Sequence, residues 1–169
     1  MPSVLFVCTA NRFRSPLASA FFRDALRSLR ADETWEVDSA GAWTIPGLPV
    51  LPEVSLIARK YGLDLARHRS KPVTEALLSN FDLILVMETG HLEALQNEFP
   101  SHSGRIYLLS QVTEGRVYSV PDLIHSAESM MEVGGNLHDL IRSGFENICA
   151  LAIRLREARG GSSNPDRAG

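Results

Sequence analysis

Two patterns of hydrophobic residues alternate along the chain. A continuous apolar run occupies residues 3–7, the stretch at 81–87 is the strongest strand signal after it, and shorter strand-like stretches lie at 34–41 and 104–110. Runs of this length that are rich in β-branched and aromatic residues are typical of strands buried on both faces. We therefore predict four strands, with the run at 3–7 in the centre of a sheet.

Helical spacing appears between and after these strands. Apolar residues recur every three or four positions over residues 16–29, 54–61 and 91–99, and a longer stripe runs from 137 to 155. Apolar strands that alternate with helices predict a parallel sheet covered on both faces. Right-handed crossovers then give a doubly wound α/β fold with four parallel strands, and the last helix should pack on the sheet.

Composition and charge narrow the function classes. The chain has 169 residues, 44% hydrophobic and 22% charged, and a formal net charge of -3. We expect one domain over residues 1–159 and a flexible tail over 160–169, which carries no apolar anchor. Without a global basic field, neither nucleic acid nor a membrane surface is an expected partner. No transmembrane stretch or secretory signal is visible, so we expect a cytoplasmic protein.

The only two cysteines, Cys8 and Cys149, lie far apart in the sequence. Neither belongs to a CxxC or Cys/His pattern, so we expect two free thiols and no structural zinc site. Cys149 falls inside the last predicted helix, where we interpret it as a small core residue. Cys8 stands at a different kind of position, directly after the first strand.

The stretch "VLFVCTANRFRSP" (4–16) is typical of an anion-binding site. In an open parallel sheet, ligands sit at the carboxyl ends of the strands, where Cys8 is placed. We expect Thr9–Arg14 to form a loop, Ser15 to cap the next helix and Pro16 to occupy its first position. Backbone N–H groups and the helix N-terminus would then face the sulfur, favouring both a thiolate and a tetrahedral oxyanion.

Two further residues of this stretch suit an oxyanion loop. The planar guanidinium of Arg14 can hold two oxygens of a phosphate, which a lysine cannot do. Asn11 tolerates the left-handed backbone that a tight loop needs in order to turn its N–H groups inward. Ser15 is also close enough in sequence to hydrogen-bond a Cys8 thiolate.

These residues resemble the low-molecular-weight protein tyrosine phosphatases, whose loop has the form Cys-x-Gly-Asn-x-Cys-Arg-Ser-Pro. The similarity continues through "DSAG" (38–41), "FDLILVM" (81–87) and "VPD" (120–122), and covers roughly residues 3–155. The resemblance implies a flavodoxin-like fold and a metal-free, cofactor-free enzyme. Its expected substrate is a phosphorylated protein or a small phosphate ester, and its product is inorganic phosphate.

The resemblance also implies residue roles. Cys8 would be the nucleophile, Arg14 the phosphate clamp and Asp122 the general acid and base. Asn11 and Ser15 would organise the loop, and Ser39 would brace it. The expected substrate-binding residues are Thr9, Ala10, Asn11, Arg12, Phe13, Ser15, Ser39 and, as an aromatic wall of the pocket, Trp43; a buried tryptophan is the alternative for Trp43.

Three features depart from the family pattern. Ala10 replaces the glycine, Phe13 replaces the second cysteine of many members, and Asp122 is followed by Leu123 and Ile124 instead of proline and an aromatic residue. Alanine in place of glycine at position 10 constrains the loop backbone. Leu123 and Ile124 alter the rigidity of the loop that carries Asp122 and its stacking against the substrate. Without a second thiol in the loop, we expect no internal rescue of an oxidised nucleophile.

Several activities remain open at this point. Phosphotyrosine is the expected substrate, but family members that act on phosphoarginine carry threonine where this chain has Arg12. Arg12 either faces solvent or attracts an acidic or multiply phosphorylated substrate. Arsenate reduction is a second possibility, although it needs a further accessible thiol. A phosphate-binding module without efficient catalysis is a third.

Overall fold

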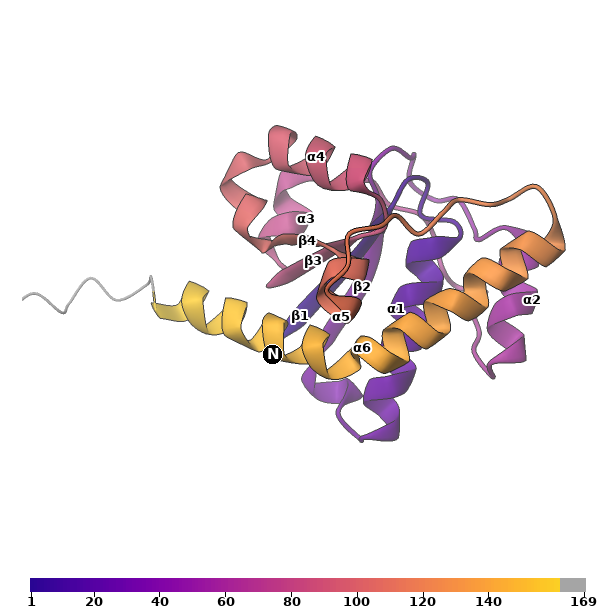
Figure 1. The fold of residues 1–169 in the computed structure, drawn as a ribbon, viewed down its shortest axis with the longest axis horizontal. Helices are drawn as coiled ribbons and strands as arrows, with labels where there is room; N and C mark the ends of the chain where they lie inside the picture. The colour runs from indigo at the N-terminus through magenta and orange to yellow at the C-terminus, as the bar shows by residue number, and fades with distance from the viewer. Residues whose placement is uncertain (162–169) are drawn as a thin grey trace, which may run out of the picture.

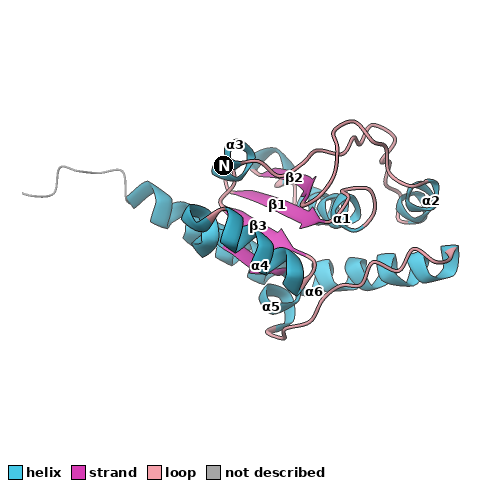
Figure 2. Ribbon diagram, turned by 90° about the horizontal axis from the view of Figure 1, so that it is seen from above, coloured by secondary structure: helices cyan, strands magenta, loops and turns pink. Residues whose placement is uncertain are grey.

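The computed structural model describes residues 1–161, in which four parallel strands form one sheet (Figure 2). The strands are β1 (Ser3–Cys8), β2 (Glu36–Gly41), β3 (Leu83–Val86) and β4 (Ile106–Leu108), in the order β2-β1-β3-β4. β1 pairs with β2 on one side and with β3 on the other. The predicted parallel sheet with a central first strand is therefore confirmed.

Helices cover both faces of this sheet (Figure 1). They are α1 (Arg14–Ser28), α2 (Pro52–Lys60), α3 (Glu75–Ser79), α4 (Thr89–Glu98), α5 (Leu109–Glu114) and α6 (Ala127–Gly161). Because successive strand residues face opposite ways, Val4 and Phe6 join a core with α1, α2, α5 and α6, whereas Leu5 and Val7 join a second core with α3 and α4. The predicted α/β fold of flavodoxin-like type is thus present.

Helix boundaries correct predictions at two helices. α1 begins at Arg14 and its N-cap is Phe13, with no side-chain capping bond, so the prediction that Ser15 caps this helix was wrong. Ser15 and Pro16 are the second and third residues of α1, so the prediction that Pro16 occupies the first helical position was wrong as well; a proline is tolerated in this first turn because the amide there has no helical partner. α6 begins ten residues before 137 and extends to Gly161, into the predicted tail; residues 162–169 lie outside the described part.

The long helix α6 packs closely against two helices. At Gly144 a Cβ atom would lie 2.3 Å from Cγ2 of Thr113 in α5, so the two backbones meet where only glycine fits. The ring of Phe145 lies 5.3 Å from that of Phe22 in α1. Further along, Nη1 of Arg156 donates to the carbonyl oxygen of Met1, 2.7 Å away. The C-terminal part of α6 therefore lies at the amino end of β1, opposite Cys8.

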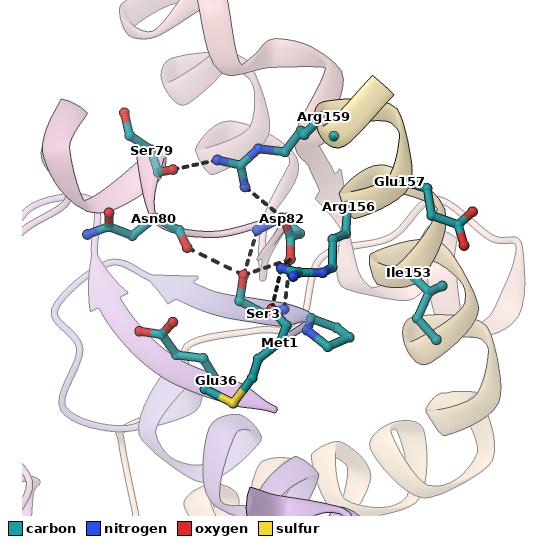
Figure 3. A pocket seen from close by; sticks show the side chains of 12 residues that line it. Met1, Ser3, Glu36, Ser79, Asn80, Asp82, Ile153, Arg156, Glu157 and Arg159 are labelled. Carbon is teal, nitrogen blue, oxygen red and sulfur yellow. Dashed lines mark hydrogen bonds and ion pairs between the residues drawn. The ribbon is translucent and has the colours of Figure 1, made fainter. Parts of the chain in front are cut away.

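A buried carboxylate organises this amino end of the sheet (Figure 3). Oδ2 of Asp82 accepts hydrogen bonds of 3.0 Å from both the backbone N–H and the hydroxyl of Ser3, and Oδ1 accepts one of 2.8 Å from Nη1 of Arg159. A cavity of about 900 Å³ opens beside them. Because both carboxylate oxygens already have partners, we interpret this cluster as structural.

Residues 1–161 contain neither a membrane-spanning helix nor a cluster of metal-binding side chains. None of the helices within residues 1–161 is long and apolar enough to cross a membrane. The same residues contain no cluster of three or more His, Cys, Asp or Glu side chains that could hold a metal ion.

Candidate active site

Cys8 ends β1 and lies at the carboxyl edge of the sheet, with only 2% of its surface exposed. Its Sγ atom is 2.9 Å from Oγ of Ser15, and the backbone N–H of Ser15 points at the same sulfur from 3.4 Å. This N–H belongs to the first turn of α1, where helical amides have no carbonyl partner. The helix start is thus aimed at the sulfur, an arrangement suited to a thiolate.

Asn11 holds the loop between Cys8 and α1 in shape. Its φ of 58° lies in the left-handed region, as the sequence predicted. Its Nδ2 donates to the hydroxyls of Ser15 and Ser39, both at 2.9 Å, and its Oδ1 accepts from the backbone N–H of Lys71 at 3.0 Å. Ser39 is buried beside it. One side chain therefore ties the loop to β2 and to the segment after α2.

His68 contacts the backbone of the same residue, Asn11. Its Nε2 lies 2.7 Å from the carbonyl oxygen of Asn11. Because that oxygen can only accept, Nε2 must carry a proton. Burial lowers the pKa of His68, and the hydrogen bond to Asn11 raises it by less. Neutral His68 is therefore a donor to the loop backbone.

Arg14 reaches from the first turn of α1 across the carboxyl edge of the sheet and is 1% exposed. Its Nη1 donates to Oε2 of Glu88 at 2.9 Å and to the carbonyl oxygen of Val120 at 2.8 Å. Its Nη2 lies 3.4 Å from the hydroxyl oxygen of Thr9. The guanidinium is thereby fixed to three different loops.

The Nε of Arg14 is the single buried side-chain nitrogen or oxygen within residues 1–161 that lacks a hydrogen-bond partner. It forms an ion pair with Oδ1 of Asp122, 3.5 Å away, but no hydrogen bond. A buried charged donor without an acceptor is costly, by roughly 1–3 kcal/mol or more. This N–H group is available to an anion that enters beside Cys8.

Asp122 lies in the loop between α5 and α6, with 43% of its side chain exposed. Val120 fixes this loop at two points, because its N–H donates to the Met87 carbonyl oxygen at 2.8 Å and its own carbonyl accepts from Arg14. The half-exposed carboxylate lines the cavity that contains the sulfur. Leu123 and Ile124, which replace the family's proline and aromatic residue, are also exposed.

A cavity of about 170 Å³ joins these groups. Its lining residues are Cys8, Ala10, Arg12, Phe13, Arg14, Leu51, Asp122 and Ile124. An engineered apolar cavity of comparable volume holds a benzene molecule, so a phenyl ring fits here. The cavity is therefore lined by the sulfur, by the charged side chains of Arg12, Arg14 and Asp122, and by apolar side chains.

Trp43 does not belong to this wall. Its backbone N–H donates to the Thr9 carbonyl oxygen at 3.0 Å, but its side chain is 86% exposed and does not line the cavity. The alternative of a buried tryptophan was therefore wrong, and the contribution of Trp43 to substrate binding stays a prediction. Leu51 and Ile124 supply the apolar wall instead.

Two functional-site residues were missed by the sequence reasoning. Glu88 follows β3 and pairs with Arg14, and His91 in the first turn of α4 contacts the loop through Nε2, 2.8 Å from Oγ1 of Thr9. Burial lowers the pKa of His91, while Glu88 raises it by less. The position of Glu88 at the end of an apolar strand was a usable signal, because polar residues there face the ligand edge of a parallel sheet.

A parallel α/β sheet whose first strand delivers a buried cysteine into a loop closed by arginine defines the class of cysteine-based phosphatases. The sequence model of the family described as low molecular weight phosphotyrosine protein phosphatase matches residues 3–149. The chain belongs to this low-molecular-weight protein tyrosine phosphatase family.

Three similar proteins illustrate the family membership. The low molecular weight protein-tyrosine-phosphatase YfkJ of Bacillus subtilis is 32% identical over 157 residues, 89% of this chain and 95% of the relative. The low molecular weight protein tyrosine phosphatase from T. tengcongensis superposes with a TM-score of 0.80 at 31% identity, over 86% of this chain and 99% of the other. The YwlE arginine phosphatase, in a mutant form with a phosphorylated active-site serine, gives 0.79 at 25% identity, over 98% and 97%.

Proposed function

We propose that this enzyme hydrolyses phosphotyrosine in proteins through a phosphocysteine on Cys8. The observation that carries the proposal is the buried Nε of Arg14, which has no hydrogen-bond partner and lies beside the cavity that contains Cys8. A phosphoryl group placed there accepts from Nε and Nη2, a bidentate grip that only arginine offers. The amides of the loop and of the first turn of α1 hold its remaining oxygens.

The groups of the site suit two displacement steps. In the first, the Cys8 thiolate attacks phosphorus, the bond from phosphorus to the phenolic oxygen breaks, and Asp122 gives its proton to that oxygen. In the second, Asp122 takes a proton from water, the water oxygen attacks phosphorus, and the bond to sulfur breaks. Inorganic phosphate leaves and the thiolate is restored. Arg14 and the loop stabilise the charge on the equatorial oxygens in both steps.

Phosphoarginine is a second candidate substrate, favoured by the similarity to the YwlE arginine phosphatase. The cavity supports tyrosine instead, because its apolar wall of Leu51 and Ile124 suits an aromatic ring, whereas Arg12 places a like charge beside a phosphorylated guanidinium. The cavity therefore supports phosphotyrosine over phosphoarginine.

The remaining thiol does not suit arsenate reduction. Cys149 is half-buried in α6, and burial raises its pKa to about 11. It precedes Arg156, which contacts the amino end of β1, whereas Cys8 is at the carboxyl end. Because a disulfide needs Cα atoms within about 7 Å, we infer that Cys149 does not resolve an oxidised Cys8 in this fold. A nucleophilic thiol that must stay reduced also fits the proposed cytoplasmic location.

The test is a substrate panel in which one peptide carries phosphotyrosine, phosphoserine or phosphoarginine in turn, with a small aryl phosphate alongside. We expect turnover of phosphotyrosine and of the aryl phosphate, and none by the Cys8→Ser variant. Turnover of phosphoarginine in preference to phosphotyrosine would replace the substrate assignment. Tight phosphate binding with no turnover of any ester would instead identify a phosphate-binding module.

A further inference from the structure

Arg12 is anchored at the wall of the cavity. Its Nε donates to the carbonyl oxygen of Pro49 at 2.8 Å, and its own carbonyl accepts from the N–H of Leu51 at 3.2 Å. The side chain is half-buried and lines the cavity together with Cys8. This double attachment to the segment before α2 holds the guanidinium at the entrance, so little side-chain entropy remains to be lost when it binds a ligand.

The charge of Arg12 is not neutralised within the protein. Among residues 1–161, no ion pair includes Arg12, although Glu53 lies in the first turn of neighbouring α2. Arg67 and Arg69 flank His68, which touches the loop, and these two arginines form no ion pair in the described part either. Arg12 thus brings a positive charge without an ion-pair partner to the lining of the cavity, beside Arg14 and Asp122, although the whole chain carries a net charge of -3.

We propose that Arg12 binds a second anionic group, the carboxylate of an acidic residue next to the phosphotyrosine of a protein substrate. This inference rests on the proposed phosphatase function and names its substrate class. Arg14 already serves the phosphoryl group at the floor of the cavity, whereas Arg12 has no task there. Its terminal N–H groups have the fork geometry that a carboxylate accepts.

The size of the cavity decides where the second anion comes from. A volume of about 170 Å³ is filled by the phenyl ring and phosphoryl group of one phosphotyrosine. A second negative group on the same ring has no room beside Leu51 and Ile124. The anion that reaches Arg12 at the entrance therefore belongs to a residue that flanks the phosphotyrosine in the peptide chain.

The experiment compares kcat/KM for two phosphotyrosine peptides that differ only by glutamate or glutamine on either side of the phosphotyrosine. We expect wild type to prefer the glutamate peptide by roughly threefold to fivefold, the scale of one partly exposed ion pair. Arg12→Leu should abolish the preference and Arg12→Lys, which keeps the charge, should retain most of it. Arg59→Gln removes the same charge from the exposed C-terminal turn of α2 and should leave the preference intact. Raising the salt from about 0.05 M to about 0.5 M should weaken it.

Equal kcat/KM for the two peptides, or a preference that survives Arg12→Leu, would overturn the inference while leaving the phosphatase function in place. Absence of turnover for every phosphoester would overturn the proposed function instead. In that case the affinities of both peptides for Cys8→Ser, measured by fluorescence anisotropy, decide the inference separately. Binding of the glutamate peptide no tighter than the glutamine peptide then refutes it.

Discussion

Replacement of Arg14 by lysine tests the central feature of the site. The change keeps a positive charge but removes the planar fork, and it acts on a side chain that is 1% exposed. A lysine ammonium would be drawn to the acceptors that Nη1 now serves, Oε2 of Glu88 and the carbonyl oxygen of Val120. The phosphoryl group would then face no donor at the position of the present Nε. We expect the fold to persist and turnover to collapse.

The size of the effect follows from the contacts that are lost. A phosphoryl group bound by Nε and Nη2 receives two charge-assisted hydrogen bonds, each worth about 1.5–3 kcal/mol. Loss of both bonds costs about 3–6 kcal/mol, at least as much as removal of one oxyanion-hole donor, which lowers turnover by roughly 10²- to 10³-fold. Loss of one of the contacts to Glu88 and Val120 should reduce the free energy of unfolding by about 1–3 kcal/mol.

The assay measures kcat/KM for a small aryl phosphate at 25 °C and the competitive inhibition constant of inorganic phosphate, together with the melting temperature. Arg59→Lys, the same substitution on the exposed surface of α2, is the control and should match wild type in all three measurements. In Arg14→Lys, weaker inhibition by phosphate should accompany the loss of turnover, because the same fork holds the product. A variant that stays folded and keeps more than about a tenth of wild-type kcat/KM would refute the assignment of Arg14 as the clamp.

Three further changes test other parts of the structure. Asp122→Asn should slow hydrolysis strongly for esters with poor leaving groups and less for activated aryl phosphates, because a good leaving group needs less protonation; equal losses across a leaving-group series would remove Asp122 from the acid role. Gly144→Ala should lower the melting temperature by several degrees, because its Cβ would lie 2.3 Å from Cγ2 of Thr113; an unchanged melting curve would contradict the close packing. Peroxide should inactivate the enzyme with little recovery on late reduction, and mass spectrometry should find no disulfide between Cys8 and Cys149.

The sheet and the loop were predictable from sequence because their signals are local. An unbroken apolar run such as residues 3–7 can be satisfied only by burial on both faces, and Cys8 follows that run directly. The left-handed backbone of Asn11 was likewise predictable, because few residue types adopt it. The start of α1 was misplaced because Ser15 is a good capping residue that here uses its hydroxyl on Cys8 and Asn11 instead.

Contacts between residues that are far apart in the sequence were not predictable in the same way. The exposed side chain of Trp43 and the wall position of Leu51 depend on how the loop before α2 crosses the entrance, and no periodicity encodes that path. Glu88 differs, because its place after a buried strand could have marked it as a residue of the ligand edge of the sheet, although the sequence analysis missed it. What the sequence did not contain was the pairing of that carboxylate with Arg14, a contact across 74 residues.

Arg14 explains why these distant residues matter to one another. Its guanidinium bonds Glu88 after β3, Val120 before Asp122 and Thr9 in its own loop, so the three segments at the carboxyl edge share one buried cation. A buried charge is costly unless its hydrogen bonds are made, and here the Nε–H of Arg14 makes none and has only its ion pair with Asp122. The protein contacts therefore hold the guanidinium of Arg14 in place, and under the proposed function its remaining donor is the one from which an oxygen of the phosphoryl group accepts.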